Sequence, residues 1–124
     1  MILVDTSVWV SHIRQADGGL TRLLSERQVF LHPFVIGELA CGNLPNRKQT
    51  LYEFTWLQSA SLATQDEVLE MIEVHKLHGR GVGWADVNIL ASALLHDCPL
   101  WTLDNALREA AKTVGVKVHT PTVH

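Results

Sequence analysis

The chain has 124 residues, 47% of them hydrophobic and 19% charged, and this composition predicts one compact domain, residues 1–124, with a buried core. Its net charge of −3, from 13 acidic and 10 basic residues, argues against nucleic acid as a partner, since phosphate binding normally goes with a basic excess. No segment approaches the roughly 18 apolar residues of a membrane helix, which argues against a membrane protein.

The first half of the chain is predicted to alternate short strands with helices. The apolar run at residues 1–4 predicts a strand, and apolar side chains at helical spacing over residues 6–14 predict a helix. Asp17 and the two glycines after it indicate a turn. Pro33 suits the first turn of a helix, which Gly42 is expected to end. The other predicted elements of this half are a helix at 20–27, a strand at 29–31 and a helix at 45–57.

The second half continues the alternation. Thr64 and Glu67 have the spacing of a capping box, which predicts the start of a helix with an apolar stripe. The glycines between residues 79 and 83 predict a loop, and the strongly apolar residues 84–96 predict a helix. The other predicted elements are strands at 61–63, 99–103 and 116–118 and a helix at 106–112 that closes near Gly115. This order predicts an α/β sandwich with a mainly parallel sheet.

Two features concern the location of the protein. The first residues are apolar but lack the basic segment of a signal peptide, and Asp5 interrupts the apolar run. Cys41 and Cys98 form neither a CxxC pair nor a disulfide framework, and both are predicted to be small buried residues. We therefore expect a protein of the reducing cytoplasm.

Four acids stand out because of their positions. Asp5 and Asp104 each follow an apolar strand directly, and a parallel sheet would bring both to its carboxyl edge, where open α/β folds bind ligands. Asp86 opens a helix on or beside its buried face, where the helix dipole favours an acid. Glu38 has apolar neighbours, among which an ionised side chain would be costly without a partner or a metal.

Four carboxylates at one point would repel one another, so the set implies a cation. Ligation by oxygen alone, without His or Cys, favours Mg²⁺ or Mn²⁺. Such an ion can position and deprotonate a water and stabilise charge during phosphodiester hydrolysis. Without these four acids the chain has nine acidic residues against ten basic ones, and bound metal would no longer repel phosphate, so the net charge is a weak objection to nucleic acid.

The motifs around the acids are ordered along essentially the whole chain. They are Ile-Leu-Val-Asp-Thr-Ser at residues 2–7, Gly-Glu-Leu at 37–39 with Gly42, Asp86 within the apolar run 84–93, and Leu-Trp-Thr-Leu-Asp at 100–104. Together they resemble a PIN domain of the VapC toxin type. The resemblance implies a PIN-like three-layer α/β/α sandwich with a mainly parallel sheet of about five short strands.

For the site, the resemblance implies a ribonuclease. Asp5, Glu38, Asp86 and Asp104 would bind one or two Mg²⁺ or Mn²⁺ ions and cut RNA. Thr6 and Thr102 would orient the acids. Family members usually dimerise and are inhibited by a cognate antitoxin whose C-terminal segment occupies the active-site groove. The apolar helices predicted at 33–42 and 45–57 are candidates for the dimer interface.

Simpler roles compete with the catalytic ones. Asp5, Asp86 and Asp104 could each only cap or begin a helix, whereas Glu38 has no such simple role. Arg80 is predicted to contact phosphate, and the alternative is that it is a solvated loop cation. The residues after Asp104 depart from common family versions, which puts a role for Asn105 in doubt. His75 and His78 lack a third ligand at suitable spacing for a metal.

Other functional classes fit less well. A phosphatase of the haloacid dehalogenase type needs a second Asp where Ser7 stands, and a phosphoacceptor receiver domain needs an acidic pair at the first strand. Two readings related to the resemblance stay open, namely an inactive PIN-fold module that binds RNA or protein, and a housekeeping PIN nuclease. Loss of activity usually shows as a missing acid, and none of the four is missing.

Overall fold

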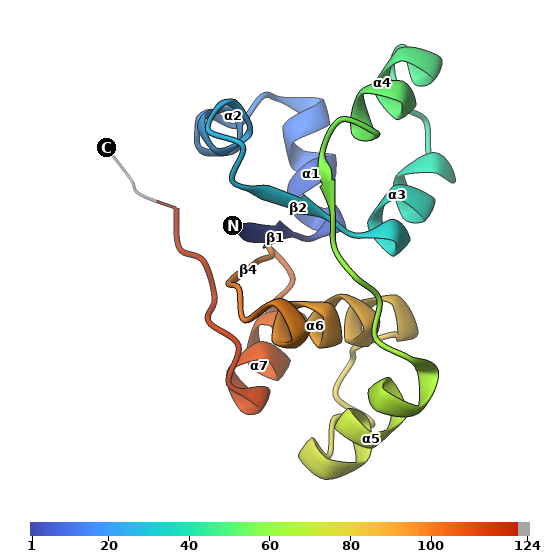
Figure 1. Cartoon of the computed structure of the whole chain (residues 1–124), viewed down its shortest axis with the longest axis vertical. Helices are drawn as coiled ribbons and strands as arrows, with labels where there is room; N and C mark the ends of the chain where they lie inside the picture. Colours follow the sequence, from blue (N-terminus) through green and yellow to red (C-terminus); the bar gives the residue numbers. More distant parts are fainter. Residues whose placement is uncertain (122–124) are drawn as a thin grey trace.

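The computed structural model describes residues 1–121 and has a four-stranded parallel sheet at its centre (Figure 1). The spatial order of the strands is β3-β2-β1-β4, and every pairing between neighbours is parallel. Leu3 in the central strand lies opposite Phe30 on one side and Leu100 on the other. The strands are β1 (Ile2–Val4), β2 (Val29–Leu31), β3 (Gln58–Ser59) and β4 (Leu100–Trp101).

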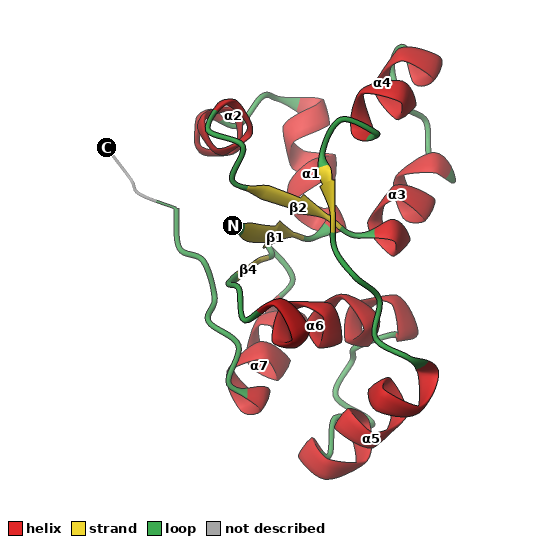
Figure 2. Ribbon diagram, viewed as in Figure 1, coloured by secondary structure: helices red, strands yellow, loops and turns green. Residues whose placement is uncertain are grey.

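Helices cover the sheet on both sides. Figure 2 shows the strands between α1, α2 and α4 on one side and α5, α6 and α7 on the other. The helix α3 contacts both α1 and α6, so it joins the two layers at the carboxyl end of β2. The predicted α/β sandwich with a parallel sheet is therefore confirmed. The helices are α1 (Thr6–Arg14), α2 (Gly18–Ser25), α3 (Pro33–Ala40), α4 (Arg47–Phe54), α5 (Gln65–His75), α6 (Trp84–His96) and α7 (Asn105–Val114).

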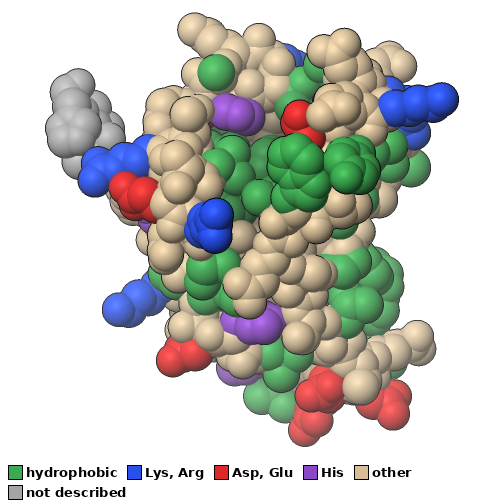
Figure 3. Space-filling view, turned by 45° about the horizontal axis from the view of Figure 1, so that its top comes forward, with side chains coloured by type: hydrophobic (Ala, Val, Ile, Leu, Met, Phe, Trp, Pro, Cys, Tyr) green, Lys and Arg blue, Asp and Glu red, His purple; other side chains and the backbone are tan. Residues whose placement is uncertain are grey.

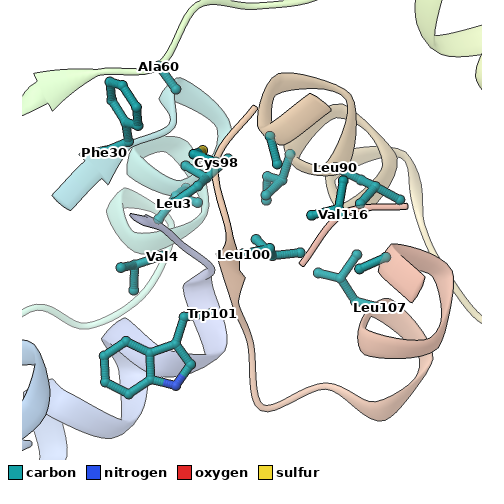
Figure 4. Close-up of a cluster of buried hydrophobic side chains, with 14 of the residues drawn as sticks. Leu3, Val4, Phe30, Ala60, Leu90, Cys98, Leu100, Trp101, Leu107 and Val116 are labelled. Carbon is teal, nitrogen blue, oxygen red and sulfur yellow. The ribbon is translucent and has the colours of Figure 1, made fainter. Parts of the chain in front are cut away.

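The core follows from the burial of the sheet on both faces. Successive side chains of a strand point to opposite faces, and both faces here are covered, so β1, β2 and β4 are apolar runs. The edge strand β3 is polar and exposed. Figure 4 shows Leu100 pointing toward Leu90, Leu107 and Val116, while Trp101 points to the other side of β4. The sheet is thereby fixed between two helical layers, and its strand ends have defined positions.

Several predicted elements match the structure. The helices predicted at 6–14 and 84–96 and the strand predicted at 29–31 have the observed bounds. The capping box is present, because the Thr64 hydroxyl accepts from the Glu67 N–H at 3.1 Å and the Glu67 carboxylate accepts from the Thr64 N–H at 2.9 Å. Within residues 1–121, no helix has the length and apolar character needed to cross a membrane.

The strand predictions need three corrections. The strand predicted at 61–63 is wrong, since the chain instead pairs with β2 through Gln58 and Ser59. The strand predicted at 116–118 is reduced to one bridge between Val118 and Leu100, so the sheet has four strands and not about five. The strand predicted at 99–103 covers only β4 and ends at Trp101.

Some helix bounds and one burial prediction also change. The helix predicted at 20–27 begins at Gly18, because Asp17 caps it through a 3.0 Å bond from the Leu20 N–H. The helix predicted to end at Gly42 ends at Ala40, whose carbonyl accepts from Arg47 at 2.6 Å. The helices predicted at 45–57 and 106–112 span Arg47–Phe54 and Asn105–Val114. Cys98 is buried, but Cys41 is exposed, contrary to the prediction.

Candidate active site

Asp5 is held at the carboxyl end of β1 by two hydroxyl groups. Its Oδ2 accepts from Ser7 Oγ at 2.7 Å and from Thr102 Oγ1 at 2.8 Å. The same oxygen lies 3.4 Å from the Ser7 N–H, where Asp5 caps α1. The side chain is only 4% exposed, and donors from α1 and from the segment after β4 fix its orientation. Asp5 therefore caps α1 and is also held in place by two hydroxyl groups. Its role as a helix cap does not exclude a role in the site.

Asp104 is tied to Asp5 through Thr102. The Thr102 hydroxyl donates to Asp5 and accepts from the Asp104 N–H at 3.0 Å. Asp104 also caps α7, since its Oδ1 accepts from the Leu107 N–H at 3.2 Å. The prediction that Asp104 directly follows a strand is wrong by two residues, because this hydroxyl turn separates the acid from β4. The Thr102 side chain nevertheless connects Asp5 at the end of β1 with Asp104 after β4.

Glu38 and Asp86 come from helices. Thr6 Oγ1 at the start of α1 donates to Glu38 Oε1 on α3 at 2.7 Å. The Gly83 N–H donates to Asp86 Oδ2 at 2.9 Å, in the first turn of α6. Glu38 is exposed, so the expected cost of burying its charge is wrong, while Asp86 is half-buried. These two acids thus have one short hydrogen bond each.

Electrostatic coupling shows that the four acids share one region. Burial raises the pKa of Asp86, the Gly83 N–H opposes this shift, and the negative charges of Asp5, Asp104 and Glu38 raise the pKa further. A like charge raises a carboxyl pKa only over a short range. The four acids singled out from the sequence therefore lie in one region, near enough for three of them to influence Asp86.

Each acid has one held oxygen and one oxygen without a hydrogen bond in the described part of the chain. The second oxygens are Asp5 Oδ1, Glu38 Oε2, Asp86 Oδ1 and Asp104 Oδ2. Four carboxylate oxygens of this kind fit a hard divalent cation such as Mg²⁺ or Mn²⁺. Among residues 1–121, however, no three His, Cys, Asp or Glu side chains are already close enough to hold a metal ion. The donor chemistry fits a cation, and its binding would require the acids to move closer.

The other predicted residues lie in less specific surroundings. Arg80 donates to Thr113 Oγ1 on α7 at 3.0 Å, so its predicted phosphate contact stays a prediction. Asn105 accepts from Arg108 at 2.7 Å. Among residues 1–121, His75 and His78 belong to no group of three potential ligands close enough to hold a metal ion.

Two residues were missed in the sequence, one in contact with Asp5 and the other at the end of β2. Ser7 donates to Asp5 and also accepts from the Leu103 N–H at 2.9 Å, which connects α1 to the segment after β4. Its signal was a hydroxyl two residues after a strand-end acid. His32 follows β2 and is completely buried. Its signal was a polar residue at a third strand end, directly before Pro33.

Comparisons with known proteins place the chain among similar sequences and folds. The model of the PIN domain matches residues 2–113. Ribonuclease VapC32 from two strains of Mycobacterium tuberculosis is 44% identical over 117 residues, which cover 94% of this chain and 94% of that protein.

Solved structures share the fold. DNA-bound VapBC from Salmonella typhimurium superimposes with a TM-score of 0.71 at 20% identity, covering 95% of this chain and 96% of that one. Mycobacterium tuberculosis VapC20, described as a sarcin-ricin loop cleaving toxin, superimposes with a TM-score of 0.62 at 20% identity, covering 89% and 95%.

Proposed function

The chain belongs to the PIN domain family, and on this premise we propose that it is a metal-dependent endoribonuclease, the toxin of a toxin-antitoxin pair. The observation that carries the proposal is the location of four carboxylates in one region. Each has one oxygen that accepts no hydrogen bond from the described residues. The 44% identity to a protein named a ribonuclease supports the reaction class. The unit that acts is the single PIN domain predicted for residues 1–124.

The residues of the chain would bind the cation and hold its ligands. We assign Asp5, Glu38, Asp86 and Asp104 as metal-binding residues. A bound Mg²⁺ or Mn²⁺ would supply an activated water and stabilise negative charge on the phosphate and leaving oxygen. Hydroxyl and amide donors hold one oxygen of each of the four acids in a defined orientation.

The orienting groups differ from acid to acid. Thr102 and Ser7 hold Asp5, and Thr6 holds Glu38. The Gly83 and Leu107 amides hold Asp86 and Asp104. On the face in Figure 3, Lys and Arg side chains are scattered and do not form one patch. A bound divalent cation would itself attract the RNA phosphate.

Partners and location are further parts of the proposal. A cognate antitoxin is the expected protein partner, and the likeness to structures described as VapBC supports it. A homodimer is proposed as well, and the exposed Tyr52 and Trp56, 59% and 67% exposed in or beside α4, support an interface there. Arg80 is proposed to contact substrate phosphate. We place the protein in the cytoplasm, where RNA substrate and a reducing environment are found together.

The test uses purified protein, RNA and defined metal. We expect internal cleavage of RNA with Mg²⁺ or Mn²⁺, no cleavage in EDTA, and recovery when the metal is restored. The Asp5→Asn protein serves as the control for a contaminating nuclease. Cleavage that persists in EDTA would contradict the metal mechanism. Binding of RNA without cleavage under all metal conditions would favour the inactive binding module instead.

A further inference from the structure

A buried hydrogen bond connects the two helices that carry Glu38 and Asp86. His32 Nε2 at the start of α3 lies 2.9 Å from Ser92 Oγ in α6. Both residues have 0% exposure, and α3 packs against α6. Since a buried polar contact is sensitive to geometry, this pair restricts how α3 and α6 can sit against each other.

The protonation state of His32 follows from its two partners. Its Nδ1 accepts from the Phe34 N–H at 3.0 Å and caps α3, so this nitrogen has no proton. The proton of the neutral ring must then be on Nε2, which donates to Ser92 Oγ. Burial lowers the pKa of His32 to about 4, although a hydrogen bond to the Asn88 backbone opposes this shift, and the ring stays neutral near pH 7. One imidazole therefore satisfies the cap of one helix and a hydroxyl of the other.

Glu38 and Asp86 are equally far in sequence from the hydrogen bond between His32 and Ser92. Glu38 follows His32 by six residues in α3, and Asp86 precedes Ser92 by six residues in α6. Six residues of helix correspond to a rise of about 9 Å. A change in the contact would therefore be transmitted along two short, stiff segments to two carboxylates.

We propose that His32 and Ser92 are positioning residues that set the distance between Glu38 and Asp86, and thereby the affinity of the site for a divalent cation. The proposal rests on the proposed function for its metal, but its geometric part concerns the metal-free chain. Neither residue touches the acids, so each would act through its helix.

The two functions of His32 can be separated by substitution. Asn places an acceptor near the position of Nδ1, so His32→Asn keeps the cap of α3 and loses the bond to Ser92. Gln reaches the position of Nε2, so His32→Gln keeps a donor for Ser92 and loses the cap. Ser92→Ala removes the bond from the other side. His96→Asn is the matched control, because His96 accepts from the Ser61 N–H at 2.8 Å at the far end of α6.

The first measurement is calorimetric Mn²⁺ binding on variants with a cooperative thermal unfolding transition. We expect about tenfold weaker Mn²⁺ binding for His32→Asn and Ser92→Ala, the lower end of the range for residues that support metal ligands. The proteins with His32→Gln and His96→Asn should stay within about twofold of the unsubstituted protein, a spread well below that range. Unchanged Mn²⁺ affinity in folded His32→Asn and Ser92→Ala would overturn the proposal. If Ser92→Ala does not fold, Ser92→Cys replaces it, with the same expectation.

The second measurement uses NMR of the metal-free protein. Imidazole nitrogen shifts should show Nε2 protonated and Nδ1 unprotonated, and Ser92→Ala should shift the amide signals of Glu38 and Asp86 together. The opposite tautomer, or unmoved Glu38 and Asp86 signals, would overturn the proposal. Absence of Mn²⁺ binding and RNA cleavage in the unsubstituted protein would overturn the proposed function, and these amide signals would then decide the geometric part alone.

Discussion

The two halves of the candidate site are built differently. Asp5 and Asp104 lie beside strand ends and share the hydroxyl of Thr102, which is 1% exposed. Glu38 and Asp86 lie on helices, and each accepts one hydrogen bond that involves no buried hydroxyl; Glu38 is exposed and Asp86 is half-buried. Backbone at the end of a buried sheet moves little, whereas packed helices can shift against each other. The strand-end half is therefore a fixed reference, and the helical half is the part that can adjust when a cation binds.

Removal of a charge from the fixed half should have the largest effect. Asp5→Asn keeps the shape of the side chain and removes one carboxylate oxygen from the proposed ligands. We expect RNA cleavage to fall by more than the roughly 100-fold upper range known for supporting residues, because Asp5 would be a direct ligand. Cleavage rates with saturating Mn²⁺ test this, and circular dichroism checks that the variant is folded. Normal cleavage by folded Asp5→Asn, absent from a mock preparation without the protein, would show that the site is elsewhere.

Thr102→Val should come next. Val keeps the volume of the side chain but removes the hydroxyl that donates to Asp5 and accepts from the Asp104 N–H. We expect cleavage to fall about 10- to 100-fold. The free energy of unfolding should drop by about 1 to 3 kcal/mol, because buried partners remain unpaired. Urea unfolding and cleavage kinetics measure the two quantities. An unchanged free energy of unfolding for Thr102→Val would mean that the strand-end half, with Asp5 and Asp104, is not the fixed one.

The contact between α3 and α6 through His32 should make the free energy of unfolding depend on pH. Burial lowers the pKa of His32 from 6.5 to about 4, so below pH 6.5 the unfolded chain takes up a proton that the folded chain does not. Stability from this group is complete above pH 6.5 and is lost as the pH falls toward 4. Between pH 7.5 and 5.5 this loss is about 1 kcal/mol. Urea unfolding of the unsubstituted protein and of His32→Asn measures it by difference. Equal pH slopes for the two proteins would contradict the shift.

Thr6→Val should have the smallest effect and completes the comparison. It is the same substitution as Thr102→Val, but the hydroxyl that it removes serves the exposed Glu38. We expect a change in unfolding free energy below about 1 kcal/mol, since water can replace the lost donor. Cleavage should fall less than for Thr102→Val. A larger loss of stability for Thr6→Val than for Thr102→Val would reverse the assignment of fixed and adjustable halves.

The sequence predicted the identity of the acids better than the way in which they are held. Asp5 was placed correctly because β1 is an unbroken apolar run that ends at the acid. Glu38 was singled out for a burial cost that does not exist, since its apolar neighbours face the core and the acid faces outward. The PIN-like fold was predicted from the order of the motifs, and membership of the family confirms it.

The missed features depend on neighbours that are remote in the chain. The bond between His32 and Ser92 joins residues 60 positions apart, and no local pattern encodes it. The strand β3 carries the polar residues Gln58 and Ser59, and its pairing is set by the neighbouring β2 and not by its own hydrophobicity. The break after Trp101 depends on the Thr102 hydroxyl, which turns the chain toward Asp104.

The shortness of the outer strands has a consequence for how copies of the chain can associate. At one edge of the sheet β3 has only two residues, and at the other Val118 lies beside Leu100 of β4. Short or covered edges offer few free backbone groups for another strand, which protects a sheet from edge-to-edge aggregation. A second copy would therefore find little to extend in this sheet, and assembly would proceed through helix surfaces.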